Sequence, residues 1–293
     1  MTCFLSTSCF RGEKLFNAIE KCGELSDKKV EISAPHPYET LDELKKIFKT
    51  FVKKDYNFVF HNYFPTPKKS FVLNIASSDQ DTIKSCGEMC ESVIELSPFA
   101  NSNLYGIHAG YLSKATVAKD GNFKFDDLEP NYKNSLKNAT TFVNSIHAKF
   151  KNKNINLVIE NLFPSISRRS SLFCSLDEIK EFMSLIPKDV GLLLDLGHLN
   201  ISSNLLEFDK NIFLEKFLDL FGHRLLEVHI SENNGVKDEH LAVRKNSWQL
   251  KAIKNIYEVK PSLSKNRVYC LEARNSKIND LKISLSLINK IIN

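Results

Sequence analysis

The chain has 293 residues, which is long for one ordinary domain but typical of a single (β/α)8 barrel. Its hydrophobic fraction of 42% and charged fraction of 26% are those of a globular protein with a large core, and they exclude a disordered chain. A formal net charge of +5 without a long basic track disfavours a nucleic-acid partner, and no apolar run is long enough to span a bilayer.

The seven cysteines show no spacing that indicates a disulfide framework or a zinc cluster. We therefore expect reduced thiols, most of them acting as small apolar core residues, and a cytoplasmic protein. The N-terminal string MTCFLSTSCFRGE carries neither the charged region nor the long apolar region of a signal peptide. No membrane partner is expected, and the sequence leaves an oligomer open.

Short apolar segments alternate along the chain with segments of helical periodicity. The apolar segments predict strands at residues 3–10, 29–33, 57–64, 103–110, 155–163, 190–198, 224–231 and 267–274. The periodic segments predict helices at residues 14–25, 40–54, 79–97, 131–150, 175–186, 214–222, 248–259 and 280–292. Helix boundaries are indicated by Thr40 as an N-cap, by the capping-box pattern Ser175…Glu178, and by Gly222 as a C-cap.

The strict alternation of strand and helix predicts parallel strands joined by right-handed crossovers. Eight such units favour a closed (β/α)8 TIM barrel over an open doubly wound sheet, with residues 1–293 forming one domain. No GxGxxG follows the first strand, which argues further against a dinucleotide-binding fold. Residues 71–77 form a short apolar piece, and the polar residues 111–131, with Asp120 and Gly121, are expected to be an inserted loop over the barrel mouth.

Four potential metal ligands stand at the ends of the last four predicted strands. They are Glu160 in LVIEN, Asp195 in LLLDLGH, His229 in LEVHISE and Glu272 in YCLEAR. A buried strand is a costly place for a carboxylate unless a cation or a partner compensates its charge. A single strand-end glutamate more often pairs with a nearby Arg or Lys. Four ligands on consecutive strands instead favour one divalent Mn, Mg, Co, Fe or Zn ion.

Further polar side chains occupy equivalent places at strand ends or in the loops that follow. For each imidazole among them, a hydrogen-bonded structural histidine is an equal alternative. The arginine among them could bind substrate oxygens or pair with a carboxylate at the barrel rim. We expect this set to bind substrate or to form a second metal site: His61, His108, His198, Asp238, His240 and Arg274.

The order of these residues resembles the superfamily of xylose isomerase-like barrels, which contains sugar-phosphate isomerases and epimerases and the endonuclease IV family. The strings LVIEN, LLLDLGH, LEVHISENNGVKDEHL and LEAR look most like the isomerase/epimerase branch. The resemblance implies that Glu160, Asp195, His229 and Glu272 hold one divalent metal. It also implies that His198 helps to hold the substrate.

The activity that this resemblance implies is that of a sugar or sugar-phosphate isomerase/epimerase. The reaction would be proton transfer through an enediolate, with Glu160 and Glu272 as base and acid on a small carbohydrate. The substrate would be chosen by the loops at residues 65–70, 111–131 and 232–247, whose sequences do not identify the sugar.

Endonuclease IV, a zinc phosphoesterase that cuts at abasic sites, is the alternative within the same superfamily. Its site holds up to three zinc ions through nine ligands, and this chain matches the nine residue types. However, KDEHL is followed by AVRKNSW, where both branches often carry GEG, and LDLGH replaces a DTCHA-like string. The nine matching positions are His61, His108, Glu160, Asp195, His198, His229, Asp238, His240 and Glu272.

Overall fold

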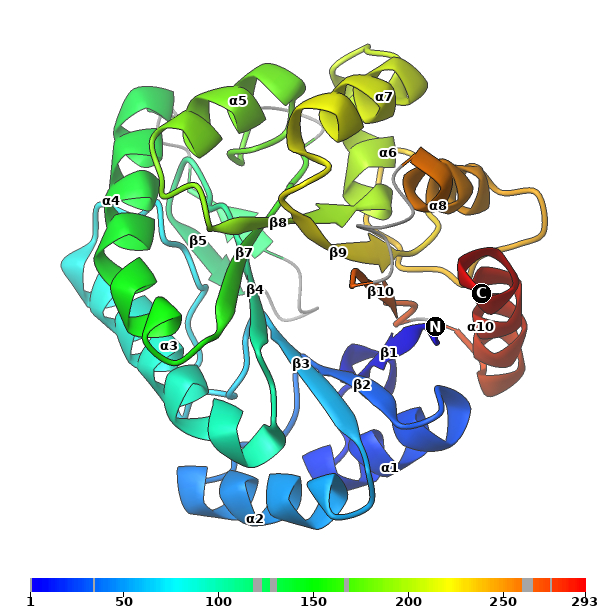
Figure 1. Cartoon of the computed structure of the whole chain (residues 1–293). Coiled ribbons are helices and arrows are strands. Elements are labelled where there is room, and N and C mark those ends of the chain that lie inside the picture. Colours follow the sequence, from blue (N-terminus) through cyan, green and yellow to red (C-terminus); the bar gives the residue numbers. More distant parts are fainter. Residues whose placement is uncertain are drawn as a thin grey trace.

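The computed structural model describes residues 2–33, 35–117, 123–126, 131–165, 169–259, 266–274 and 276–293. Within these residues, parallel strands close into a barrel that is surrounded by helices, as Figure 1 shows. The order around the barrel is β1-β10-β9-β8-β7-β4-β3-β2. The predicted (β/α)8 barrel is therefore confirmed.

The barrel strands are short and nearly all of their residues are buried, because the barrel interior covers one face and the helices cover the other. Each pairs in parallel with both neighbours, and the pairing places His108 beside Glu160 and Asp195 beside His229. The barrel strands are β1 (Phe4–Ser6), β2 (Lys29–Ile32), β3 (Asn57–His61), β4 (Leu104–His108), β7 (Asn156–Glu160), β8 (Gly191–Asp195), β9 (Leu225–Ile230) and β10 (Val268–Leu271).

The helices follow the strands and pack their apolar faces against the barrel. Two of them, α6 and α7, lie between β8 and β9, and a short 3-10 helix, η1 (Thr7–Phe10), follows β1. The helices are α1 (Leu15–Leu25), α2 (Leu41–Val52), α3 (Gln80–Ala100), α4 (Tyr132–Lys151), α5 (Leu176–Ser184), α6 (Leu196–Leu205), α7 (Lys210–Phe221), α8 (Trp248–Val259) and α10 (Ile278–Ile292).

Helix capping follows the sequence signals in part. The Thr40 hydroxyl accepts from the Glu43 backbone nitrogen at 3.3 Å, and the Glu43 carboxylate accepts from the Thr40 nitrogen at 2.7 Å, which is a complete capping box. Ser175 caps α5, but the Glu178 carboxylate accepts from the nitrogen of Cys174 instead. No helix in the described part of the chain is long and apolar enough to cross a membrane.

Helix α6 corrects the prediction of a strand at residues 190–198. The strand ends at Asp195, whose carboxylate accepts a 2.7 Å hydrogen bond from the nitrogen of His198 and so starts the helix. Because most of α6 is buried on every side, its sequence lacks the polar face that would have indicated a helix.

The described parts of the inserted segment at residues 111–131 include two paired strands, where sequence analysis predicted a loop. They are β5 (Ala115–Val117) and β6 (Phe123–Phe125), which pair antiparallel. Tyr111 packs on Phe125 with ring centroids 5.4 Å apart. The predicted loop positions Asp120 and Gly121 lie outside the described residues. Residues 71–77 form neither helix nor strand.

Candidate metal centre

Nine candidate side chains gather at the C-terminal end of the barrel. They come together because parallel strands all finish at the same mouth, as sequence analysis predicted. Six lie at or within one residue of a strand end, one lies in the first turn of α6, and two lie in the loop after β9. In chain order they are His61, His108, Glu160, Asp195, His198, His229, Asp238, His240 and Glu272.

The first group of potential ligands consists of His61, His108 and Glu160. The Oε2 atom of Glu160 accepts from Nε2 of His61 at 2.8 Å and lies 3.1 Å from Nε2 of His108. One ligand atom of each residue lies within 4.8 Å of the others. Glu160 and His61 are almost fully buried, whereas the His108 side chain is 12% exposed.

The second group surrounds Nδ1 of His229. This atom lies 3.8 Å from Oε1 of Glu160, 3.8 Å from Oδ2 of Asp195 and 3.4 Å from Oε2 of Glu272. Within the described residues, Glu160 Oε1, Asp195 Oδ2 and His229 Nδ1 are buried and make no hydrogen bond. Buried polar atoms of this kind are costly unless something binds them. Asp195, His229 and Glu272 offer ligand atoms within 4.8 Å of one another, and Glu160 lies next to them, so three carboxylates and one imidazole here fit a divalent cation.

The third group lies nearer the surface and consists of His198, Asp238 and His240. The Oδ2 atom of Asp238 accepts from Nε2 of His240 at 2.6 Å and lies 3.7 Å from Nε2 of His198. One carboxylate and two imidazoles, with ligand atoms within 4.8 Å of one another, again offer a metal-binding geometry. His198 also lies 3.4 Å from Glu160 through its Nδ1 atom, so the groups adjoin one another.

Charge compensation within the site is carried by protons and by one arginine. Burial alone would raise the pKa of Glu160, but His108 and His61 hold it well below its usual range. Burial likewise opposes ionisation of Glu272, and the neighbouring Arg274 leads the groups that lower its pKa well below the usual range. Both glutamates are therefore ionised at neutral pH.

Among the imidazoles, those of His198 and His229 have raised pKa values and hold compensating protons. Burial disfavours the charge on His198, but Asp195 and Asp238 raise its pKa to about 10. His229 has a pKa well above its ordinary value because Glu31 outweighs the effect of burial. A divalent cation entering the second group would take over this compensation and displace the protons.

Several imidazoles are oriented by their other ring nitrogen. Nδ1 of His198 donates to the carbonyl of Asn161 at 2.8 Å, and Nδ1 of His240 donates to the carbonyl of Glu272 at 3.1 Å. Nδ1 of His108 lies 3.0 Å from the hydroxyl of Tyr111. In each case the remaining nitrogen, Nε2, is directed into the site.

Arg274 is the most exposed of the candidate site residues. Its Nε atom donates to Oε1 of Glu272 at 2.9 Å, so the salt bridge that was one of its two predicted alternatives is present. Arg274 is 30% exposed and Asp238 is 22% exposed, whereas Glu272 is 1% exposed. A ligand from solvent would therefore meet the arginine before it meets the buried carboxylates.

Sequence analysis missed two carboxylates inside the barrel, Glu31 on β2 and Glu227 on β9, which are both fully buried. They lie within strands rather than at strand ends. The signal that could have found them is a carboxylate inside an apolar run, in KVEIS and in RLLEVHIS. Asn161, which follows Glu160, joins β7 to β8 by accepting from the Asp195 nitrogen at 2.7 Å.

Comparison with known proteins finds a matching family and a relative of similar length. The model of the family described as xylose isomerase-like TIM barrel matches residues 16–256. A protein of Methanocaldococcus jannaschii, Uncharacterized protein MJ1614, is 25% identical over 221 residues, which cover 75% of this chain and 74% of that protein.

Solved structures share the architecture over their whole length. A D-tagatose 3-epimerase-like protein superposes with a TM-score of 0.75 at 23% identity, covering 100% of this chain and 98% of that one. D-Psicose 3-epimerase from Clostridium cellulolyticum H10 gives a TM-score of 0.72 at 12% identity, covering 100% of both chains. At these identities the likeness shows the fold.

Proposed function

This chain belongs to the xylose isomerase-like TIM barrel family, and we propose that it is a divalent-metal-dependent sugar or sugar-phosphate isomerase or epimerase. The observation that carries the proposal is that oxygens of Glu160, Asp195 and Glu272 lie within 3.8 Å of Nδ1 of His229, and that this nitrogen and the oxygens of Glu160 and Asp195 are buried without a hydrogen bond within the described residues. The fold shared with sugar epimerases supports the substrate class.

The residues proposed to hold the metal are Glu160, Asp195, His229 and Glu272. Their donor set of three carboxylates and one imidazole suits Mn, Mg, Co, Fe or Zn. When bound, the cation supplies Lewis-acid stabilisation of negative charge on the substrate oxygens.

The proton transfer is assigned to Glu160 and Glu272. One carboxylate removes the proton from the carbon next to the substrate carbonyl, which leaves an enediolate and makes that carboxylate an acid. A proton is then returned to the enediolate, either by this acid or by the other glutamate after it has taken up a proton from solvent. Both are ionised in the absence of substrate because their neighbours lower their pKa values despite burial, so either can act as the base. Arg274 orients Glu272 through its hydrogen bond and leaves part of its guanidinium exposed to a ligand.

The other candidate residues are proposed to bind the substrate. His198 lies against Glu160, and its ring is fixed by the Asn161 carbonyl, so its Nε2 side is available to a sugar hydroxyl. Since a carbohydrate presents several hydroxyls, the imidazoles, carboxylates and single arginine gathered at this end of the barrel are chemically suited to bind it.

A second candidate function is an endonuclease IV-like phosphoesterase with up to three zinc ions. The observation that favours it is the presence of two further ligand groups, one formed by His61, His108 and Glu160 and one by His198, Asp238 and His240. In this alternative those groups hold metal ions, whereas in the first function they line the pocket.

Metal content and solvent isotope exchange together distinguish the two functions. Elemental analysis of the purified protein is expected to give roughly one divalent metal per chain for an isomerase and roughly three for the phosphoesterase. Incubation with ketohexoses and their phosphates in D2O is expected to place deuterium on the carbon next to the carbonyl. The matched control is Glu160→Gln, which lacks the base. No exchange on any sugar, together with cleavage of an abasic-site duplex, would replace the first function by the second.

A further inference from the structure

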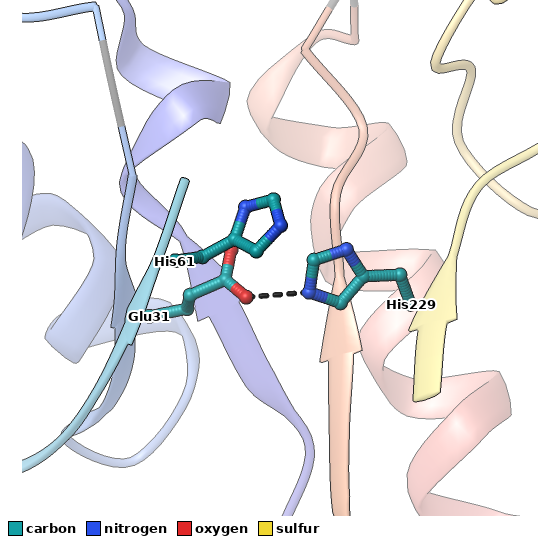
Figure 2. Close-up of side chains that lie close together, drawn as sticks. All are labelled: Glu31, His61 and His229. Atoms are coloured by element: carbon teal, nitrogen blue, oxygen red, sulfur yellow. Dashed lines mark hydrogen bonds and ion pairs between the residues drawn. The ribbon is translucent and has the colours of Figure 1, made fainter. Parts of the chain in front are cut away.

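Glu31 makes a direct hydrogen bond to a candidate metal ligand from inside the barrel. Nε2 of His229 donates to Oε2 of Glu31 at 2.6 Å, and both side chains are fully buried. Figure 2 shows the carboxylate of Glu31 pointing at the imidazole of His229, with the ring of His61 beside them. The two bonded residues come from β2 and β9, which are not neighbours in the barrel.

We propose that Glu31 is a positioning residue that keeps the proton of His229 on Nε2 and so presents Nδ1 to the metal. The inference rests on the metal centre of the proposed function. An imidazole can coordinate a cation only through a nitrogen that has lost its proton, and the hydrogen bond made by the other nitrogen decides which one that is. Here the bond to Glu31 occupies Nε2, and Nδ1 is the atom that faces Glu160, Asp195 and Glu272.

The anchor of His229 differs in kind from the anchors of His198 and His240. His198 and His240 are held by backbone carbonyls, whose positions are set by the main chain. His229 is held by an ionisable side chain from a strand that supplies none of the nine candidate ligands. A charge-assisted hydrogen bond is stronger than a neutral one and makes the coordinating nitrogen a better donor to a cation. A substitution at Glu31 should therefore weaken metal binding although Glu31 is not one of the four residues proposed to hold the metal.

The barrel offers a matched control in Glu227. It is the same residue type, is also fully buried, and lies two residues before His229 on β9. Its Oε1 atom is 3.8 Å from Nε2 of His229, which is too long for a hydrogen bond. Within the described residues its carboxylate makes no hydrogen bond. Glu227→Leu therefore removes a buried carboxylate beside His229 without removing its anchor.

The test is the affinity of the metal-free protein for Zn²⁺ alone, measured by competition with a chromophoric chelator. Glu31→Leu is expected to weaken binding by about 10- to 100-fold, the usual effect of losing such a partner. Glu31→Asp keeps the charge but shortens the side chain, so its zinc affinity should fall by a similar factor. This variant provides the test if Glu31→Leu does not fold. Glu31→Gln retains an acceptor oxygen but loses the charge, so its affinity should lie between those of wild type and Glu31→Leu, whereas Glu227→Leu should stay within about 3-fold of wild type.

A spectroscopic readout reports the tautomer independently of affinity. In the zinc-loaded protein, the ¹⁵N spectrum of the histidine side chains should show His229 protonated on Nε2 in the wild type and in Glu31→Gln, and a lost or mixed signature in Glu31→Leu. Wild-type affinity in both Glu31→Leu and Glu31→Asp, or an equal loss in Glu227→Leu, would overturn the role of Glu31. If the wild type itself binds no zinc, the metal centre and the role of Glu31 are both overturned.

Discussion

The Oδ1 atom of Asp195 accepts a 2.7 Å hydrogen bond from the backbone nitrogen of His198, while Oδ2 of the same carboxylate faces Nδ1 of His229 at 3.8 Å. One side chain thus ends β8, starts α6 and points into the candidate metal centre. The short path from strand to helix brings His198 into the site as well. Local chain geometry and the chemistry of the site are therefore set by the same residue.

The two roles of Asp195 are separable by substitution. Asp195→Asn keeps a helix cap but loses the charge, so we expect little loss in the unfolding free energy of the metal-free protein and a large loss of metal affinity. Asp195→Ala should lose the affinity and, in addition, about 1 kcal/mol of stability from the missing cap. Urea unfolding without metal and zinc titration measure the two effects. Equal stability of the two variants would mean that the cap contributes nothing.

Turnover should depend on the two glutamates more than on His61. Glu160→Gln and Glu272→Gln each remove a base or acid, and we expect each to reduce the rate of isomerisation by at least about 100-fold. His61→Ala should only weaken activity, because His61 lines the pocket in the isomerase. Initial rates with a ketose substrate check this. A His61→Ala loss as severe as that of the glutamate variants would favour the multinuclear phosphoesterase.

Metal removal should destabilise the fold. A ligand at 100 times its dissociation constant stabilises the native state by about 2.7 kcal/mol, which corresponds to a melting-temperature increase of roughly 4–5 °C for a domain of this size. Treatment with a chelator is expected to lower the melting temperature by this amount, and excess Mn²⁺ or Zn²⁺ should restore it. The Glu272→Gln variant is the control, since its response to added metal should be smaller.

Much of the fold could be predicted from the sequence because each β/α unit carries its own apolar and amphipathic pattern. Helix α6 could not be predicted, because the helix is buried on most sides and its sequence has no separate polar face. Its N-cap, Asp195, also follows directly on the apolar run LLL, and so the pattern assigns it to the strand. The hairpin β5–β6 was missed because the polar composition of its segment is typical of a loop.

The members of the candidate site could be predicted from the sequence where they lie at strand ends or in the loops that follow. The structure brings all nine together, although their role as ligands stays a prediction. Glu31 and Glu227 were missed because they lie inside strands, where only the three-dimensional pairing shows that Glu31 reaches His229 across the barrel. His61, by contrast, is the last residue of β3, and its position near a strand end made it predictable.

A pH effect on stability is expected from His36, which lies outside the metal centre. Burial lowers its pKa below the ordinary value; its Nδ1 donates to the Glu13 carbonyl at 3.0 Å, and its buried Nε2 makes no hydrogen bond within the described residues. The unfolded chain therefore binds this proton more tightly, with a pKa of about 6.5, so the contribution of neutral His36 is present above that pH and is lost as pH falls below it.

His36→Gln isolates this contribution. The difference in urea midpoint between wild type and variant should favour the wild type at pH 8 and should shrink at pH 5.5. A difference that stays constant between the two pH values would show that His36 does not change its protonation on unfolding.

The central claim is that Glu160, Asp195, His229 and Glu272 share one cation, and anomalous diffraction from crystals soaked in Mn²⁺ or Zn²⁺ tests it most directly. We predict a strong peak roughly 2.0–2.2 Å from Glu160 Oε1, Asp195 Oδ2, His229 Nδ1 and Glu272 Oε2. An anomalous map with no peak among these four atoms, in crystals soaked well above millimolar metal, would contradict it.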